Sequence, residues 1–318
     1  MAARGRTAVQ AGVRREPEAA AGELFDLIVV GGGIHGIMLA LEATRRRLRP
    51  LLLERADFGG GATAGALRLL PEEPASLGAL LRARGAADER LWWWQHFPAQ
   101  VEPLPVVMPL HEGQQGPDRR PLHRLERHLR RFRKDGAPAA LAGPRALSRD
   151  ELIEICPHLT SPDLTGGLTW TGLGIPSATR LCLEALRWGC MTGATALNYV
   201  EVTDLAVLDG AVSGVDANDR VGGARYRFQA PIVIVASGGQ ATDFIGRSTV
   251  DEPPVGAWSA LLERKPAPGV ALAWQGVGTG GTTAYLVPSA DGALYGPMIA
   301  GEAAAERPDW LIVRLILD

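Results

Sequence analysis

The chain has 318 residues, of which 46% are hydrophobic, and its formal net charge is −2. This length and apolar content can bury a sizeable core, so the composition excludes a globally disordered protein. The nearly neutral charge provides no general attraction to nucleic acid.

The N-terminal residues 1–22 contain Arg14-Arg15 without a following apolar stretch, so we expect a disordered tail rather than an export signal. No apolar run reaches the roughly 18 residues of a transmembrane helix. The cysteines, Cys156, Cys182 and Cys190, follow no metal-binding spacing. The last two fall on one expected helix, too far apart for a disulfide. This cysteine usage indicates a reducing, cytoplasmic setting.

One stretch, residues 25–57, has the strongest pattern in the chain. It predicts a buried strand at 27–30, a glycine turn, a helix at 37–46 and a second strand at 51–53 that ends in Glu54. An acidic residue about 20 residues beyond the glycine turn completes the pattern of a dinucleotide-binding unit.

The glycine turn has the spacing G-x-G-x-x-G, and each part has a physical role. Gly31 permits a tight turn, Gly33 leaves room for a pyrophosphate, and Gly36 lets helix and strand pack closely. The helix N-terminus presents N–H groups and the positive end of its dipole to phosphates. Glu54 can accept hydrogen bonds from an adenosine ribose. We therefore predict a dinucleotide site; the alternative is a glycine-rich strand end without a ligand.

Residues 117–135 are strongly basic, with eight Lys/Arg side chains against three acidic ones. Leu122, Leu125, Leu129 and Phe132 recur at helical spacing, which predicts a basic amphipathic helix. Two interpretations remain open: a solvated surface helix, or a helix that docks on an anionic membrane surface.

The second half of the chain predicts one long helix at 178–190 and then several strands. Asp209-Gly210, between apolar runs, predicts a hairpin. A further buried strand at 231–236 ends in Ser237-Gly238-Gly239. A β-meander in place of further β-α repeats fits a nicotinamide dehydrogenase less well than a flavoprotein, in which FAD lies across a discontinuous domain.

Within residues 24–245, several segments resemble the FAD-dependent glycerol-3-phosphate dehydrogenase family of amino-acid-oxidase-like flavoproteins. They are FDLIVVGGGIHGIMLALEA, LLLERADFGGGAT, PAQVEPLPVVMPL, RLCLEALRWGCMTGATALNYVEVTDL and IVIVASGGQATDF. The resemblance implies an α/β fold: a Rossmann-like FAD-binding domain with a parallel sheet and β-meander, plus a β-rich (α+β) substrate or cap domain. We expect the first domain at 23–100 and 177–247, and the second at 101–176 and 248–318.

The glycine-turn pattern and the resemblance together predict the residues that contact FAD. They are Gly31, Gly33, Ile34, His35, Gly36, Glu54, Arg55, Gly61, Ala62, Thr63, Val202, Ala236, Ser237 and Gly238. His35 sits inside the turn, where we expect it to face solvent or the cofactor edge rather than to catalyse. No metal site is expected, because the histidines form no H-x-x-x-H pair with an intervening Glu.

The resemblance also implies an activity: hydride transfer from a small substrate to flavin N5, with electrons passing on to a membrane quinone or another acceptor. Arg68 and Arg180 match basic positions of the family and are the candidate catalytic residues. The family's His-Gly-Gly element is replaced by Pro71-Glu72-Glu73, and we expect the family's C-terminal segment to be absent. Because the two glutamates would repel a phosphate, we expect a hydroxyl- or amine-bearing substrate other than glycerol-3-phosphate.

Two alternatives to this activity remain open at the level of the sequence. One is a catalytically weak or inactive FAD- or nucleotide-binding relative that acts as a partner or scaffold. The other is an NAD(P)-binding dehydrogenase. The expected location is the cytoplasm, and the membrane-docking interpretation of the basic helix at 117–135 would add peripheral attachment to the inner face of the cell membrane.

Overall fold

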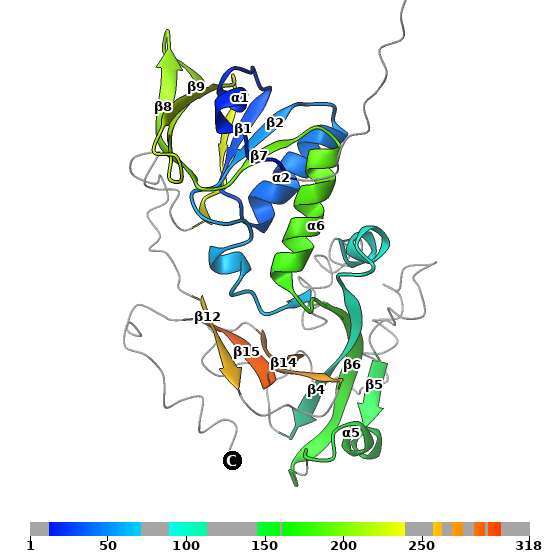
Figure 1. Ribbon diagram of the computed structural model, residues 1–318. Helices are drawn as coiled ribbons and strands as arrows, with labels where there is room; N and C mark the ends of the chain where they lie inside the picture. Colours follow the sequence, from blue (N-terminus) through cyan, green and yellow to red (C-terminus); the bar gives the residue numbers. More distant parts are fainter. Residues whose placement is uncertain are drawn as a thin grey trace, which may run out of the picture. The chain divides into compact units, whose positions relative to one another are not determined.

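The computed structural model packs as two compact units. One is made of Met1–Gly65 and Ser177–Pro253, and the other of Ala66–Pro176 and Pro254–Asp318 (Figure 1). The structure describes residues 13–70, 89–112, 145–159, 161–238, 257–262, 269–275, 283–289 and 292–299.

The first unit is built on a parallel four-stranded sheet in the order β11-β1-β2-β7. Its strands are β1 (Leu27–Val30), β2 (Pro50–Leu53), β7 (Thr195–Leu197) and β11 (Val233–Val235). Every residue of β1 and β2 is buried, which explains their continuous apolar sequence. The predicted strand at 27–30 is confirmed with the same bounds.

The two faces of this sheet are covered by different elements (Figure 1). Helices α2 (Ile34–Arg45) and α6 (Ala178–Met191) pack side by side, and the hydroxyls of Thr44 and Thr192 lie 2.8 Å apart. Leu52 faces α2, so its neighbours in the strand, which alternate, face the opposite side.

The opposite face packs against an antiparallel meander of β8 (Val200–Leu208), β9 (Ala211–Asp219) and β10 (Arg225–Gln229). The sheet and the meander share one apolar core. Its main buried members are Ile28, Val30, Leu51, Leu53, Leu197, Val202, Val215 and Phe228. The predicted hairpin between β8 and β9 is confirmed, because Asp209 and Gly210 both have positive φ, 52° and 78°.

Helix α1 (Pro17–Ala21) corrects the expectation of a disordered tail over residues 1–22. Ala20 is buried in the core between sheet and meander, and Arg15 donates from Nε to the carbonyl of Asn198 at 2.9 Å. The sequence pattern missed this because both contacts are made with residues distant in the chain. Residues 1–12 lie outside the described part.

The second unit contains an eight-stranded sheet in the order β12-β15-β14-β13-β4-β6-β3, with β5 paired to β6. Its pairs are antiparallel except for β13 with β4. The strands are β3 (Leu69–Leu70), β4 (Glu102–His111), β5 (Arg145–Ser148), β6 (Leu164–Gly174), β12 (Ala257–Leu262), β13 (Ala271–Gln275), β14 (Thr283–Ser289) and β15 (Gly292–Ile299).

Two short helical segments belong to this second unit. Helix α5 (Arg149–Ile155) begins with a capping box, in which Ser148 and Glu151 cap each other's backbone N–H. Residues 89–96 are helical, and the buried Trp93 contacts Trp92 edge to face. These two tryptophans therefore pack against each other.

Leu69 pairs with Gly174 of β6, so the chain from residue 66 onward packs with the second unit. This differs from the expected first-domain segment of 23–100. The assignment of cofactor and substrate roles to the two units stays a prediction. The expected basic helix at 117–135 lies outside the described residues.

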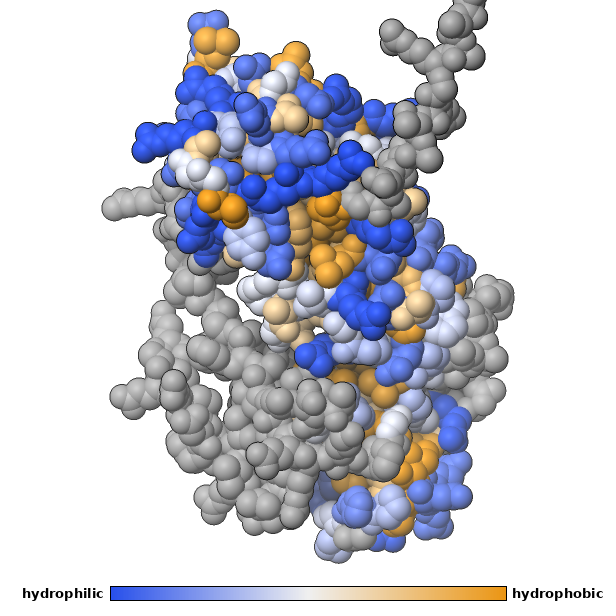
Figure 2. All heavy atoms as spheres, viewed as in Figure 1, coloured by the Kyte–Doolittle hydropathy of each residue, from blue (hydrophilic) through white to orange (hydrophobic). Residues whose placement is uncertain are grey.

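Among the helices of the described ranges, none is long and apolar enough to cross a membrane. Figure 2 shows a mostly hydrophilic surface over the first unit on the side in view, with a small apolar patch over α2 and α6. The exposed leucines on these helices are Leu39 and Leu183. Isolated apolar residues of this kind are ordinary on protein surfaces.

Candidate dinucleotide-binding site

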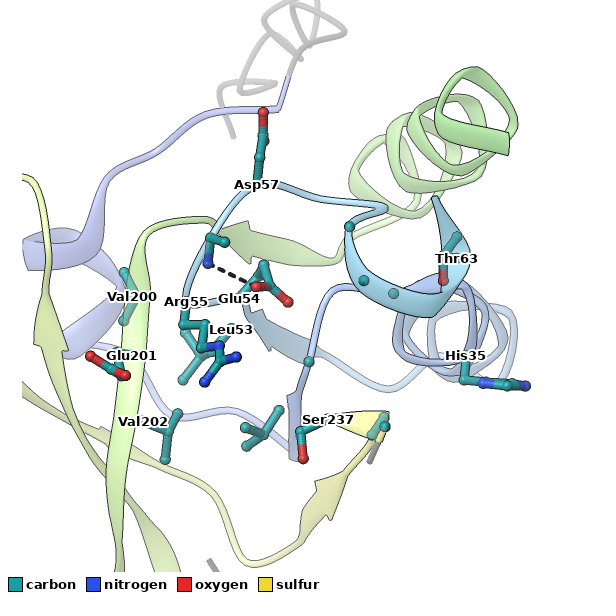
Figure 3. A pocket seen from close by; sticks show the side chains of 18 of the residues that line it. His35, Leu53, Glu54, Arg55, Asp57, Thr63, Val200, Glu201, Val202 and Ser237 are labelled. Carbon is teal, nitrogen blue, oxygen red and sulfur yellow. Dashed lines mark hydrogen bonds between the residues drawn. The ribbon is translucent and has the colours of Figure 1, made fainter. Parts of the chain in front are cut away.

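A cavity of about 460 Å³ lies in the first unit at the carboxyl ends of β1 and β2. Its walls come from the glycine turn after β1, the loop after β2, the start of β8 and the residues after β11 (Figure 3). In α/β folds, ligands bind outside the carboxyl ends of parallel strands. The short 3₁₀ helix η1 (Gly61–Thr63) closes one side of the cavity.

The structure brings together nearly all the residues that the sequence predicts to contact a cofactor. All except Gly36 line this cavity: Gly31, Gly33, Ile34, His35, Glu54, Arg55, Gly61, Ala62, Thr63, Val202, Ala236, Ser237 and Gly238. Their roles toward a cofactor stay a prediction. Further lining residues, outside the predicted contact set, include Asp57, Val200, Glu201 and Thr203.

The glycines form a cradle whose shape requires the absence of side chains. Gly31 has a φ of 112°, and a Cβ there would lie 2.5 Å from the carbonyl oxygen of Ala236. A Cβ on Gly36 would lie 1.8 Å from the carbonyl oxygen of Gly31. Among the described residues, a Cβ on Gly33 would meet only Thr63 Oγ1, at 3.1 Å. Gly33 thus faces the cavity, whereas Gly36 packs behind it.

Gly32, which the motif leaves variable, is also confined. A Cβ on Gly32 would lie 2.7 Å from Glu54 Cβ and 2.7 Å from Phe58 Cδ1. The only sequence feature that could have indicated this is the run of three consecutive glycines.

Glu54 joins the two loops that meet at the cavity. Its Oε2 accepts from the backbone N–H of Gly32 at 2.6 Å, and its Oε1 accepts from the N–H of Ala56 at 2.8 Å. A carboxylate has about four acceptor positions. Glu54 can therefore hold both loops and still accept hydrogen bonds from ribose hydroxyls.

Thr63 caps helix α2 from a separate loop. The N-cap residue Gly33 has no side chain, and the backbone N–H of Ile34 donates to Thr63 Oγ1 at 3.1 Å. This contact places a hydroxyl beside the positive end of the helix dipole, where a phosphate would also be favoured.

Ser237, just after β11, has a buried hydroxyl oxygen without a hydrogen-bond partner among the described residues. Because unsatisfied buried polar atoms are rare in folded proteins, this hydroxyl is suited to a ligand that supplies an acceptor oxygen. A phosphate in the cavity would do so. His35, by contrast, is exposed and extends along the outer side of α2 in Figure 3.

The candidate catalytic arginines lie outside this cavity. Arg180 is exposed on α6, and Arg68 lies in the second unit with a φ of 59°. Their catalytic roles stay a prediction. In the described ranges, no three His, Cys, Asp or Glu side chains come together as a metal site.

Comparison with known proteins identifies the family. The family model described as FAD dependent oxidoreductase matches residues 26–318. The chain belongs to the FAD dependent oxidoreductase family. This membership bears out the flavoprotein interpretation, and nothing in these comparisons supports the NAD(P) dehydrogenase or scaffold alternatives.

Among relatives of this FAD dependent oxidoreductase, the mitochondrial glycerol-3-phosphate dehydrogenase of Mus musculus is 27% identical over 249 residues. The match covers 71% of this chain and 33% of the relative. The chain thus spans about a third of the length of that curated protein.

Two solved structures share the fold. Glycerol-3-phosphate dehydrogenase from Bacillus halodurans, complexed with FAD, has a TM-score of 0.64 at 21% identity, over 89% of this chain and 49% of that one. L-proline dehydrogenase from P. horikoshii has a TM-score of 0.66 at 18% identity, over 92% and 75% of the two chains. They confirm the expected α/β fold with a parallel sheet and a β-rich part.

The residues present suit FAD, the cofactor of this family. The open side of Gly33 and the orphaned Ser237 hydroxyl suit the pyrophosphate, and Glu54 suits the ribose of the adenosine half. The apolar side chains of Val200 and Val202 line the cavity beyond Glu54, where they can pack against an adenine.

Proposed function

We propose that this chain binds the adenosine diphosphate half of FAD in the cavity at the carboxyl ends of β1 and β2, as part of an oxidoreductase. The observation that carries the proposal is the Glu54 carboxylate held between Gly32 and Ala56 beside the open glycine turn. FAD, when bound, supplies a hydride acceptor at flavin N5.

The proposed substrate is a small molecule that bears a hydroxyl or amine group. Names of relatives support both classes, since one is a glycerol-3-phosphate dehydrogenase and a structural neighbour is an L-proline dehydrogenase. Glu72 and Glu73 replace two glycines of the family pattern and disfavour a phosphorylated substrate through like-charge repulsion. Arg68 and Arg180 are the proposed cationic residues for the substrate.

The proposed location is the cytoplasm, at the inner face of the cell membrane. The support is the charge of residues 117–135, whose eight basic side chains would be attracted to anionic lipid. A quinone or another acceptor at that surface would reoxidise the cofactor.

An absorption spectrum of the purified, FAD-reconstituted protein tests the proposal. We expect bound flavin with bands at about 370 and 450 nm. Anaerobic addition of L-proline, glycerol and glycerol-3-phosphate in turn then shows which substrate class bleaches the long-wavelength band. A protein that retains no FAD after gel filtration would refute the binding proposal.

A further inference from the structure

Arg15 ties the N-terminal segment to the turn between β7 and β8, which leads into the cavity-lining start of β8. Arg15 donates from Nε to the carbonyl of Asn198 at 2.9 Å, and its guanidinium forms an ion pair with Asp219. The Asp219 side chain is 5% exposed, and that of Arg15 is 26% exposed. A planar guanidinium thus joins a backbone carbonyl of the β7–β8 turn to a buried carboxylate at the end of β9.

The partners of Asp219 and its burial act on its pKa in opposite directions. Burial acts to raise the pKa of Asp219, but hydrogen bonds from Arg15 and from the backbone N–H groups of Val221 and Gly222 outweigh it. The pKa of this carboxyl therefore lies below its usual range. Removal of Arg15 would leave a buried carboxylate without its cation, which is strongly unfavourable.

The turn that Arg15 holds is bonded directly to the cavity loop after β2. Tyr199 N–H donates to the carbonyl of Ala56 at 3.1 Å, and Val200 N–H donates to the carbonyl of Glu54 at 2.8 Å. The side-chain amide of Asn198 also donates to Asp57 Oδ1 at 3.2 Å.

Tyr199 has a φ of 53°, an unusual conformation for a residue other than glycine. Contacts around the turn must hold this conformation in place, because strained residues persist only where their surroundings fix them. One such contact is the Arg220 N–H, which donates to the carbonyl of Tyr199 at 2.8 Å, and Arg220 directly follows Asp219. The ion pair therefore supports the turn at two residues. Arg15 holds the carbonyl of Asn198, and Asp219 fixes the neighbouring Arg220, which holds the carbonyl of Tyr199.

We infer that Arg15 is a positioning residue for the adenosine end of the cavity. It holds the Asn198–Tyr199 turn so that the start of β8 lies beside Glu54 and lines the space proposed for adenosine. This inference rests on the proposed function, and it extends the cofactor site to Arg15, which is not among the described residues that line the cavity.

The matched control is Arg49, another arginine that pairs with the N-terminal region. Arg49 forms an exposed ion pair with Glu23, and both side chains are at least half exposed. It precedes β2, at the amino ends of the parallel strands, and does not line the cavity. Arg49→Ala therefore removes an N-terminal ion pair without touching the adenosine end.

The first measurement is the affinity for FAD and for ADP-ribose, by isothermal titration calorimetry. We expect Arg15→Ala to raise both dissociation constants by the same factor, about tenfold, or 1.4 kcal/mol. Arg49→Ala should leave both unchanged. Arg15→Lys should raise both dissociation constants by about threefold. Lysine keeps the positive charge but lacks the planar guanidinium, whose N–H groups can reach two acceptors at once.

The second measurement is hydrogen exchange of the free protein, which needs no cofactor. The Tyr199 and Val200 amides should exchange faster in Arg15→Ala, while the Ile28 amide, bonded to the carbonyl of Ile232, should keep its rate. An equal increase in the exchange rates of all three amides would indicate general destabilisation of the fold and overturn the inference.

The inference would also be overturned if the dissociation constants of Arg15→Ala for FAD and ADP-ribose stayed within twofold of the wild-type values. If that variant does not fold, Arg15→Lys decides by the same two measurements, and wild-type behaviour in both refutes the inference. If the wild type binds neither FAD nor ADP-ribose, the proposed function fails, and hydrogen exchange still decides whether Arg15 holds the turn.

Discussion

Glu54 Oε2 accepts a hydrogen bond from the backbone N–H of Gly32 at 2.6 Å, so one carboxylate joins the end of β2 to the turn after β1. The same side chain holds the N–H of Ala56. An acidic residue at this position therefore has a structural task in addition to the ribose contact that the sequence pattern predicts. Mutations of Glu54 should affect the shape of the cavity as well as one ligand contact.

We expect Glu54→Ala to weaken FAD binding by about 1–3 kcal/mol, the range for loss of hydrogen bonds to a charged group. Glu54→Gln keeps one acceptor oxygen, so it should weaken FAD binding less than Glu54→Ala. Titration calorimetry measures both affinities. The control is Glu42→Ala, which removes a partly exposed carboxylate of α2 that pairs with Arg45 and Arg46. Wild-type affinity in Glu54→Ala would contradict the assigned role.

The sequence predicted those parts of the first unit that depend on local patterns. The strand at Leu27–Val30 follows from a continuous apolar run, and the β8–β9 hairpin follows from Asp209-Gly210. The acidic position at Glu54 follows from the fixed length of one strand–helix–strand unit. Each of these three predictions depends on residues that lie within about 25 positions of one another in the sequence.

Contacts between distant segments were not predictable in this way. Thr63 caps a helix that begins 29 residues earlier, and Arg15 pairs with a carboxylate 204 residues later. Hydrogen-bonding side chains such as Thr63 leave no periodic pattern when their partner is a single N–H group. The short stretch around Arg15 looked like a tail because its stability comes from tertiary contacts rather than from its own composition.

The thiols should be poorly reactive in the folded protein. Burial raises the pKa of Cys182 to about 11 and that of Cys190 to about 11, and it also raises the pKa of Cys156. Because the thiolate is the nucleophile, we expect slow alkylation by iodoacetamide at pH 7.5 and faster alkylation as the pH approaches 11. Mass spectrometry after a timed reaction measures this for each cysteine. Equal rates in native and urea-unfolded protein would contradict the expectation.

The basic segment at 117–135 should bind anionic vesicles, and the binding should weaken as salt rises. Each Lys/Arg near an anionic surface adds about 1 kcal/mol, and salt screens this attraction over roughly 10 Å. Sedimentation with neutral and anionic vesicles tests it. Replacement of Arg130, Arg131 and Arg133 by Gln should reduce binding to the anionic vesicles. Equal binding to both vesicle types would leave the solvated-helix interpretation.

A valine at Gly33 should abolish FAD binding, whereas a valine at Gly36 should destabilise the fold. A side chain at Gly33 would enter the cavity, where Thr63 is the only neighbour within 4 Å of its Cβ in the described part of the chain. Gly33→Val should therefore fold with a near-normal thermal midpoint but bind no FAD. A Cβ at Gly36 would overlap the carbonyl of Gly31 at 1.8 Å, so Gly36→Val should unfold at a much lower temperature or be insoluble. Gly65→Ala, whose Cβ would have no neighbour closer than 3.9 Å, should leave both properties unchanged. Calorimetric melting of the free protein and FAD titration separate the two effects. Wild-type FAD affinity in Gly33→Val would show that the cofactor does not approach this turn.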